Sequence, residues 1–218
     1  MFLKNNSRYF IYRFFFILGK VFHPIRVLCN NYMSRIVENL YTGCLSVRIN
    51  ICNGSVIRYP SIRIEGPGIS IGQNSYIGKN AVITTWRTKL YEKPQIIVGN
   101  GTNIGQNCHI TAINRIEIGN CVLTGKYVTI TDNAHGSVTL DEMESDPNTR
   151  ILVSKGPVII EDNVWIGDKA TICPNVRIGK GSIIGANTVV TKSIPSYTVA
   201  VGNPARIIKS FDNYVANN

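Results

Sequence analysis

Residues 160–190 read IEDNVWIGDKATICPNVRIGKGSIIGANTVV, and every sixth residue of this stretch is aliphatic. The set is Ile160, Ile166, Ile172, Ile178, Ile184 and Val190. A helix face repeats at three to four residues and a strand alternates at two, so neither explains a period of six. A fixed period of this kind is an internal repeat, and it indicates a solenoid of identical short units.

Each unit has an aliphatic residue first, often Gly second, and a small or β-branched residue fifth. The recurrent Gly fits corners where a Cβ would crowd or where φ must be positive. Short strands joined by such corners form a triangular coil of about 18 residues, and coils stack about 4.8 Å apart. The pattern predicts an all-β parallel β-helix of about six coils, with aliphatic columns as its core.

Outward from this stretch, the repeat begins loosely near Ser55 and is interrupted three times. The first interruption is Thr85 to Pro94, and the second is a shift of two residues across Ala112 to Asn114. The third, residues 132–156, is long, polar and acidic. Loops of more than about 12 to 15 residues are uncommon in compact domains and are often functional.

Three segments are predicted: a basic, aromatic, helical segment 1–40, the β-helix 41–210 and a frayed tail 211–218. Residues 1–26 hold five cations and no acidic residue, which is half of the net charge of +10. The apolar run from Tyr9 to Leu18 is interrupted by Arg13 and is shorter than the ~20 residues that span a bilayer. Two interpretations stand equally: a helix lying on the inner face of the cytoplasmic membrane, or a helix that covers the end of the coil or a neighbouring subunit.

Composition narrows the function. No nucleic-acid-binding motif accompanies the positive charge, so no nucleic-acid partner is predicted. The six cysteines contain no C-x-x-C pair, which favours buried free thiols in a reducing cytoplasm over a disulfide framework. A zinc hydratase on a β-helix needs three histidine ligands, and of the three histidines His23 lies in the N-terminal segment. No metal is therefore predicted.

His135 is the histidine at the mouth of the long polar loop. On the residues alone, a solvent-exposed loop histidine is the more frequent interpretation. Imidazole is nevertheless well suited to take a proton from a hydroxyl near neutral pH, which acyl transfer to an alcohol requires.

Five motifs carry a resemblance to a known family: residues 111–114 (TAIN), 130–136 (ITDNAHG), 163–167 (NVWIG), 190–195 (VTKSIP) and 201–206 (VGNPAR). Together with the repeat, over about residues 55–210, they resemble the hexapeptide-repeat acyltransferases. They are most similar to lipopolysaccharide (O-antigen) O-acetyltransferases and more distantly similar to galactoside and maltose O-acetyltransferases. The resemblance implies a left-handed β-helix and a homotrimer with acetyl-CoA sites between adjacent prisms.

The resemblance also implies roles for residues near the interruptions. His135 matches the catalytic histidine, and Asp132 is the nearest carboxylate to orient it. Glu142 and Glu144 are rivals, and Asp132 serves equally well as a turn residue. Asn114 matches an asparagine that binds acceptor hydroxyls, with a turn-filling asparagine as the equal alternative.

For acetyl-CoA, the matching positions lie in the last two coils and the close of the repeat. Trp165 matches a tryptophan near the pantetheine arm, with a surface platform between subunits as the alternative. Gly167 and Ala186 match positions whose backbone lines the pantetheine groove. The positions that meet CoA phosphates are Thr191, Lys192, Arg206 and Lys209, with a solvated basic face as the alternative.

These inferences predict an O-acetyltransferase that moves an acetyl group from acetyl-CoA to a sugar hydroxyl in surface-polysaccharide biosynthesis. The acceptor would be a sugar or polysaccharide. An N-acetyltransferase acting on an amino sugar is the closest rival, and a non-catalytic β-helix is a third possibility.

Overall fold

The computed structural model describes residues 18, 20 and 32–211. The chain divides into two compact units, residues 1–40 and 41–218. In the first unit the described residues 32–40 are helical, and the second unit begins with six helical residues, 41–46. Apart from residues 18 and 20, the segment 1–26 lies outside the described residues, as does all of the tail 211–218 except residue 211. Of the helices that the structure describes, none is long and apolar enough to cross a membrane.

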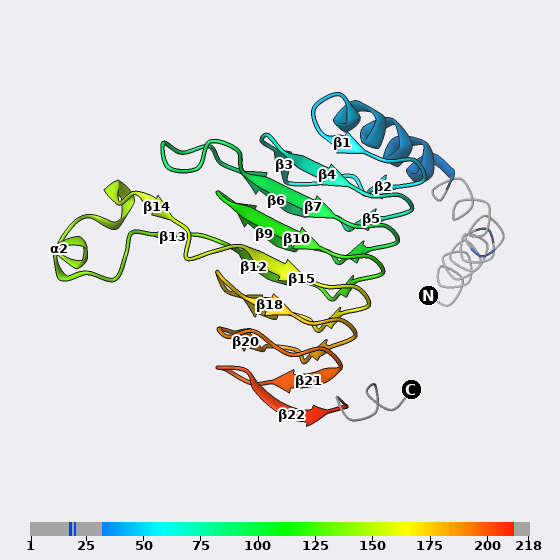
Figure 1. Cartoon of the computed structure of the whole chain (residues 1–218). Coiled ribbons are helices and arrows are strands. Elements are labelled where there is room, and N and C mark those ends of the chain that lie inside the picture. The colour runs from blue at the N-terminus through cyan, green and yellow to red at the C-terminus, as the bar shows by residue number, and fades with distance from the viewer. Residues whose placement is uncertain (1–17, 19, 21–31, 212–218) are drawn as a thin grey trace, which may run out of the picture. The chain divides into compact units, whose positions relative to one another are not determined.

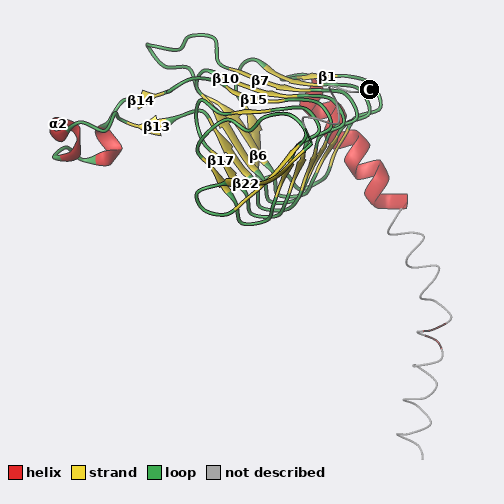
Figure 2. Ribbon diagram, turned by 60° about the horizontal axis from the view of Figure 1, so that its bottom comes forward, coloured by secondary structure: helices red, strands yellow, loops and turns green. Residues whose placement is uncertain are grey.

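The second unit is a parallel β-helix with three sheets, here called A, B and C, which the chain visits in that order in each coil (Figures 1 and 2). Sheet A consists of β1 (Asn50–Ile51), β4 (Ile69–Ile71), β7 (Gln95–Val98), β10 (Arg115–Ile118), β15 (Val158–Ile160) and β18 (Arg177–Ile178). Sheet B consists of β2 (Val56–Ile57), β5 (Tyr76–Ile77), β8 (Asn103–Ile104), β11 (Leu123–Thr124), β16 (Trp165–Ile166), β19 (Ile183–Ile184), β21 (Thr198–Val201) and β22 (Arg206–Ser210). Sheet C consists of β3 (Arg63–Glu65), β6 (Val82–Thr85), β9 (His109–Ala112), β12 (Thr129–Thr131), β17 (Thr171–Ile172) and β20 (Val189–Val190). The predicted architecture of about six triangular coils is confirmed.

The core is the predicted aliphatic column. Residues at the first position of each unit, such as Ile104, Ile130 and Ile166, are fully buried. The fifth position also points inward and holds small or β-branched residues, among them Cys108 and Ala170. Burial of an aliphatic side chain contributes about 1.5–3 kcal/mol, so stacked columns stabilise a coil that has no conventional core.

Two different positions of the repeat close the corners. The Gly at the second position does not have positive φ; instead, a Cβ on Gly78 would lie 2.6 Å from the carbonyl carbon of Gly105 in the next coil. The left-handed conformation falls two residues later, at the fourth position, where Asn is the most frequent residue, as at Asn163 (φ 60°) and Asn187 (φ 56°). Asn tolerates this conformation better than most residues do. Crowding therefore explains the Gly, and the fourth position carries the turn.

The register between coils records each interruption. Ile160 pairs with Ile178, 18 residues later, which is one regular coil. Ile71 pairs with Val98 and Val98 with Ile118, separations of 27 and 20 residues. The excesses over 18 are the nine residues 86–94 and the two-residue shift at 113–114. Ile118 pairs with Ile160, 42 residues later, across the long excursion.

All three interruptions lie on one edge of the prism, between sheets C and A, which we call the C–A edge. It comprises the corners at residues 66–68, 86–94, 113–114, 132–157, 173–176 and 191–193. Figure 1 shows the excursion and the loop 86–94 leaving the coils on the same side. The excursion contains the antiparallel pair β13 (Ala134–His135) and β14 (Leu152–Val153), helix α2 (Leu140–Met143) and the 3-10 helix η1 (Pro147–Thr149).

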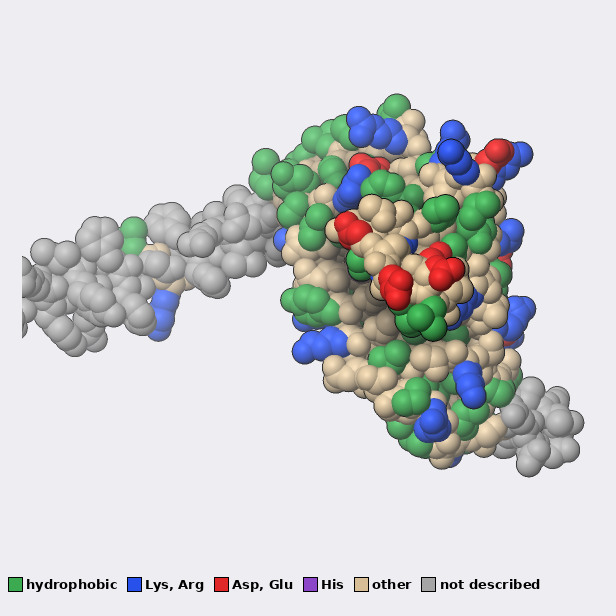
Figure 3. All heavy atoms as spheres, turned by 90° about the vertical axis from the view of Figure 1, so that its left-hand side faces the viewer, with side chains coloured by type: hydrophobic (Ala, Val, Ile, Leu, Met, Phe, Trp, Pro, Cys, Tyr) green, Lys and Arg blue, Asp and Glu red, His purple; other side chains and the backbone are tan. Residues whose placement is uncertain are grey.

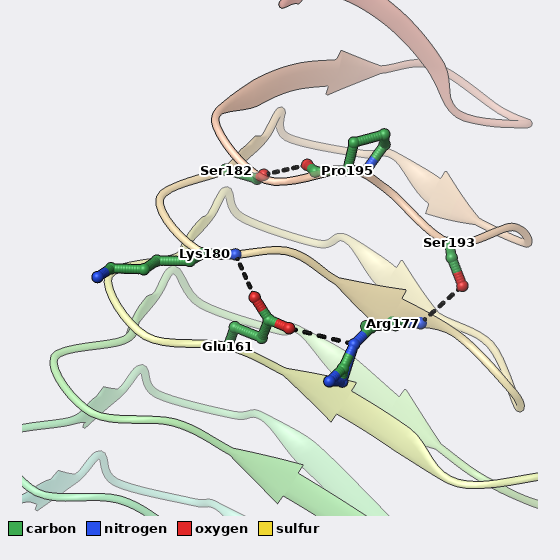
Figure 4. A network of polar contacts seen from close by, with 6 residues as sticks. All are labelled: Glu161, Arg177, Lys180, Ser182, Ser193 and Pro195. Atoms are coloured by element: carbon green, nitrogen blue, oxygen red, sulfur yellow. Dashed lines mark hydrogen bonds and ion pairs between the residues drawn. The ribbon is translucent and has the colours of Figure 1, made fainter. Parts of the chain in front are cut away.

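Sheet A of the last two coils carries polar links between its strands (Figure 4). The carboxylate of Glu161 lies 3.1 Å from Nε of Arg177 and accepts a hydrogen bond from the amide of Lys180 at 2.8 Å. Exposed ion pairs of this kind contribute at most about 1 kcal/mol. Glu161, Arg177 and Lys180 line a hollow of about 440 Å³ on this face, and their contacts contribute little to the stability of the fold.

Candidate functional site

Asp132 begins the excursion and is completely buried. Its Oδ1 accepts the amide of Ile113 at 2.9 Å, and its Oδ2 accepts the amides of Asn114 at 2.8 Å and Arg115 at 2.7 Å. The two-residue shift would otherwise leave these amides without partners, which costs about 1–3 kcal/mol for each buried group. The carboxylate therefore replaces the missing ladder and joins the corner 113–114 to the base of the excursion.

The interpretation of Asp132 as a turn residue is the one that these contacts match. Among the hydrogen bonds of the described residues, Asp132 binds those three amides and the side-chain amide of Asn133, and none of its bonds goes to His135. Its predicted role as the orienting partner of His135 stays a prediction. Within one chain, the carboxylate positions the excursion as a whole.

His135 lies on β13, where the excursion leaves the prism, and its side chain is exposed. It pairs with Leu152 of β14, so a short hairpin fixes its backbone. The next residue, Gly136, is buried with φ +76°, and a Cβ there would lie 3.0 Å from Oε2 of Glu142. A side chain at position 136 would be strained by the positive φ and would push against the ends of the Glu142 and Arg150 side chains. The histidine thus stands on a constrained hairpin and not at a free loop tip.

Glu142 and Glu144 lie at the outer part of the excursion. Glu142 belongs to α2, whose N-cap is Thr139, and its Oε2 is buried without a hydrogen-bond partner among the described residues. Glu144 is exposed. Neither makes a hydrogen bond to His135 that the structure records. Figure 3 shows acidic side chains gathered near the middle of the face from which the excursion projects, with Lys and Arg around them.

Asn114 is fixed through its backbone at the corner above Asp132. Its amide donates to Asp132, and its carbonyl accepts the amide of Gln95 at 2.9 Å. The loop 86–94 ends at Gln95, so the three interruptions are bonded to one another along the C–A edge. The structure brings Asn114, Asp132 and the hairpin of His135 together on this edge.

One contact of this edge had no signal in the sequence. The hydroxyl of Tyr91 donates to the carbonyl of Ser154 at 3.2 Å and accepts the amide of Ser154 at 3.2 Å. These residues are 63 positions apart, in two different interruptions. Tyr91 therefore fastens the loop 86–94 to the residue that follows β14, the strand that pairs with β13.

The positions matched to pantetheine lie on a different part of the prism. Trp165 is on the outer face of sheet B between Leu123 and Ile183, and 51% of it is exposed. Gly167 and Ala186 form the corners between sheets B and C in successive coils, and a Cβ on Gly167 would lie 2.6 Å from the amide nitrogen of Ala186. The two residues are stacked neighbours, as a continuous groove wall requires.

The four positions matched to CoA phosphates are all exposed and lie on two elements. Thr191 and Lys192 follow β20 on the C–A edge, below the excursion. Arg206 and Lys209 lie on β22, which pairs antiparallel with β21 and ends sheet B. Lys209 Nζ stands 4.6 Å from the ring centre of Phe211. One chain therefore does not gather these cations at a single point.

The cysteines that the structure describes are free thiols, but the expectation that they are buried holds only in part. Cys108 is buried in the core, whereas Cys44 and Cys121 are exposed. Cys121 occupies the left-handed fourth position of a corner, φ 54°, which points its side chain outward. In the part of the chain that the structure describes, no group of three or more His, Cys, Asp or Glu side chains is placed to hold a metal ion.

Comparison with known proteins agrees with this geometry. Residues 157–192 match the family model "Bacterial transferase hexapeptide (six repeats)", and residues 64–85 match "Hexapeptide repeat of succinyl-transferase". In fold, the chain is similar to AntD, an N-acyltransferase from Bacillus cereus, with a TM-score of 0.64 and 18% identity over 81% of this chain and 92% of that chain. It is also similar to the hexapeptide-repeat acetyltransferase VCA0836 from Vibrio cholerae, with a TM-score of 0.56 and 24% identity over 79% and 80% of the two chains. These likenesses define the class of fold, a left-handed parallel β-helix built of hexapeptide repeats.

A full-length relative narrows the class. The chain is 34% identical over 179 residues to the "Putative lipopolysaccharide biosynthesis O-acetyl transferase WbbJ" of Escherichia coli K12, covering 80% of this chain and 88% of that protein. The chain belongs to the hexapeptide-repeat acyltransferase family, and it is an acyltransferase.

Proposed function

We propose that this protein transfers an acetyl group from acetyl-CoA to a hydroxyl of a sugar, in the biosynthesis of a surface polysaccharide. The observation that carries the proposal is the similarity to the Escherichia coli protein, which extends over 88% of that protein and whose name states O-acetyl transfer in lipopolysaccharide biosynthesis. The placement of His135 on a short hairpin that leaves the same edge of the prism on which Asn114 lies supports it.

In the proposed reaction, His135 acts as the general base. Its imidazole takes the proton of the acceptor hydroxyl while the oxygen attacks the thioester carbonyl. The new C–O bond forms, the C–S bond breaks, and the proton passes from the imidazolium to the departing sulfur. A thiol is a competent leaving group because its ordinary pKa is about 8.5. Asn114, half-buried beside this corner, would hold the acceptor by a second hydroxyl.

Acetyl-CoA is proposed to lie along the edge between sheets B and C. The glycine at position 167 lets the corners of two coils stack closely, and these corners would form the wall against which the pantetheine arm lies. Trp165 would flank the thioester end. The exposed cations Arg206 and Lys209, at the end of sheet B, would meet the phosphates of CoA, and Lys192, on the C–A edge, would do so from a neighbouring prism. Charged pairs of this kind are about twice as strong as neutral hydrogen bonds.

The active site is proposed to lie between subunits of a homotrimer. His135 leaves the prism at the C–A edge, whereas Gly167 and Ala186 lie on the edge between sheets B and C. Within one chain, the proposed base and the proposed acetyl-CoA site therefore lie on different edges. Adjacent prisms can bring the two edges together. The excursion also exposes large apolar side chains, namely Val138, Leu140, Met143 and Ile151. An exposed apolar group of this size indicates a protein contact, and a neighbouring subunit would supply it.

A panel of sugar acceptors tests the proposal, with release of CoA thiol as the readout and mass spectrometry of the product. An O-acetyl ester is cleaved by alkaline hydroxylamine, whereas an N-acetyl amide survives. Ester formation that His135→Ala abolishes supports the proposal. An amide product would assign the enzyme to N-acetylation, and a wild-type protein that binds no acetyl-CoA would leave a non-catalytic β-helix.

A further inference from the structure

The loop 86–94 carries positive charge that no ion pair among the described residues neutralises. Among the ion pairs and hydrogen bonds of the described residues, none involves the side chains of Arg87, Lys89 or Lys93, and all three are exposed. The loop has one acidic residue, Glu92, so its net charge is +2. Exposed cations held together on one loop repel one another, and an anionic ligand relieves that repulsion.

These cations line a preformed hollow. The amide of Thr88 donates to the carbonyl of Tyr91 at 3.0 Å, and the amide of Tyr91 donates back to Thr88 at 3.2 Å, which closes the loop into a cup. The cup has a volume of about 540 Å³ and is lined by Arg87, Thr88, Lys89, Glu92 and Lys93. A closed loop presents its charges without further ordering, which lowers the entropy cost of binding a ligand.

The cup is fastened next to the proposed base. Tyr91 is bonded to Ser154, and Ser154 is two residues from Leu152, the partner of His135 in the hairpin. Two residues of a strand span about 7 Å. Lys155, exposed beside Ser154, adds a fourth cation on the same side. An acceptor whose hydroxyl lies at His135 would therefore extend towards the cup.

We propose that this loop, with Arg87, Lys89 and Lys93, binds the phosphate or diphosphate of a phosphorylated sugar acceptor. The inference rests on the proposed function and specifies its substrate class: a sugar still attached to its activating phosphate, and not a neutral sugar. Arginine and lysine are the side chains that recognise phosphate, by bidentate hydrogen bonds and as point charges respectively. The acidic outer part of the excursion, with exposed Asp141, Glu144 and Asp146, disfavours an anion there and leaves the cup as its place.

The principal test is kinetic. We expect Arg87→Gln/Lys89→Gln/Lys93→Gln to raise KM for hexose 1-phosphates about tenfold or more while kcat/KM for the matching methyl glycosides stays within twofold. Arg48→Gln/Lys79→Gln/Lys180→Gln removes the same charge from exposed residues outside the loop and should change neither value. Equal losses for phosphorylated and neutral acceptors in the loop variant, or equal effects of both triple variants, would overturn the inference.

Glu92→Gln provides an opposite test. Removing the one carboxylate of the cup should tighten binding of a phosphate, so KM for the phosphorylated acceptor should fall severalfold. A rise in KM would contradict phosphate binding in the cup. The same exposure of all four side chains means that the variants should fold, which circular dichroism checks.

Binding of inorganic pyrophosphate separates this inference from the proposed function. Calorimetry should show pyrophosphate binding to the wild type and its loss in the loop variant, whatever atom the enzyme acetylates. Absence of any acetylated sugar would sink the proposed function but leave that result standing. If the wild type bound pyrophosphate no more strongly than the loop variant does, the inference that the cup binds phosphate would be refuted. Nucleotide-linked and lipid-linked acceptors then identify the source of the phosphate, and loss of binding to anionic vesicles without any pyrophosphate effect would assign the loop to a membrane surface instead.

Discussion

The last two coils and the C–A edge obey different rules. In residues 158–190 every corner has the same length, a left-handed residue at the same position and an amide bonded to the carbonyl of the next coil, as Gly167 is to Ile184. On the C–A edge of the earlier coils, the corners have three, nine, two and more than twenty residues. The carboxylate of Asp132 and the hydroxyl of Tyr91 link the last three of these corners to one another. The regular repeat determines a rigid scaffold of stacked coils, here called the frame, but all of its corners have the same conformation and the same hydrogen bonds. Specialised side chains stand where repetition stops, because loops on a rigid frame can change without loss of the fold.

Replacing a histidine in each region should give the largest difference. His135→Ala removes the proposed base and should lower kcat about 10²–10⁴-fold. His109→Ala is the matched control, since His109 is exposed on the regular strand β9. It should keep activity within twofold, and neither change should alter thermal stability because neither side chain is buried. Steady-state acetylation of the preferred acceptor measures the first effect. The catalytic assignment is falsified if His135→Ala retains most of the wild-type kcat.

A substitution in the regular coils should have the opposite effect, lowering the stability of the fold more than the activity. Ile130 is buried in the aliphatic column of the fourth coil, which consists of β10, β11 and β12. Ile130→Ala should lower the free energy of unfolding by about 2–5 kcal/mol. Leu123, in the same coil, is 46% exposed, and Leu123→Ala should cost below about 1 kcal/mol. Urea unfolding at one protein concentration compares them. Equal losses would mean that the outer face of sheet B is covered in the assembled protein.

The fold of the regular coils could be predicted from the sequence because every coil must bury an aliphatic residue at the same positions. An aliphatic residue at each sixth position has one arrangement that buries all of them, so the period alone implied the sheets and the inward column. The left-handed fourth position also left a signal, the repeated Asn and Gly at that place, which was available before the structure. The sequence left two explanations open for the Gly at the second position, since crowding and positive φ both favour Gly, and crowding is the one that the structure shows.

The contacts of the C–A edge could be predicted only in part. The sequence located the interruptions and His135, but the partners of Asp132 lie 17 to 19 residues earlier and become its neighbours only after the two-residue shift is placed in the coil. The bond from Tyr91 to Ser154 depends on how two irregular segments fold against each other. Neither periodicity nor local propensity reports such a contact, since each occurs once.

Replacing one aspartate in each region, on the C–A edge and at a regular corner, should give a smaller difference in stability. Asp132→Asn places an amide against three backbone donors in a buried site and should cost about 2–3 kcal/mol, with partial loss of activity because the excursion loosens. Asp162→Asn should cost below about 0.5 kcal/mol. Asp162 accepts the amide of Asn120 at a regular corner, and Asn120 does the same for Asn100 with an amide side chain. Denaturant unfolding and acetylation rates measure both. A neutral Asp132→Asn would mean that the carboxylate charge is not needed at the shift.

The thiols should show the smallest difference, one of reactivity alone. Burial raises the pKa of the Cys108 thiol, so less of it is thiolate at a given pH, and the side chain is also shielded from reagents. Cys121 is exposed at a corner. Because the thiolate is the nucleophile, iodoacetamide at pH 8 should label Cys121 at least about tenfold faster than Cys108 in the folded protein. Mass spectrometry of the peptides measures each rate, and urea should bring the two rates together. Equal rates without urea would show that coil three opens on the time scale of labelling, and the contrast between a rigid frame and a specialised edge would then fail for that coil.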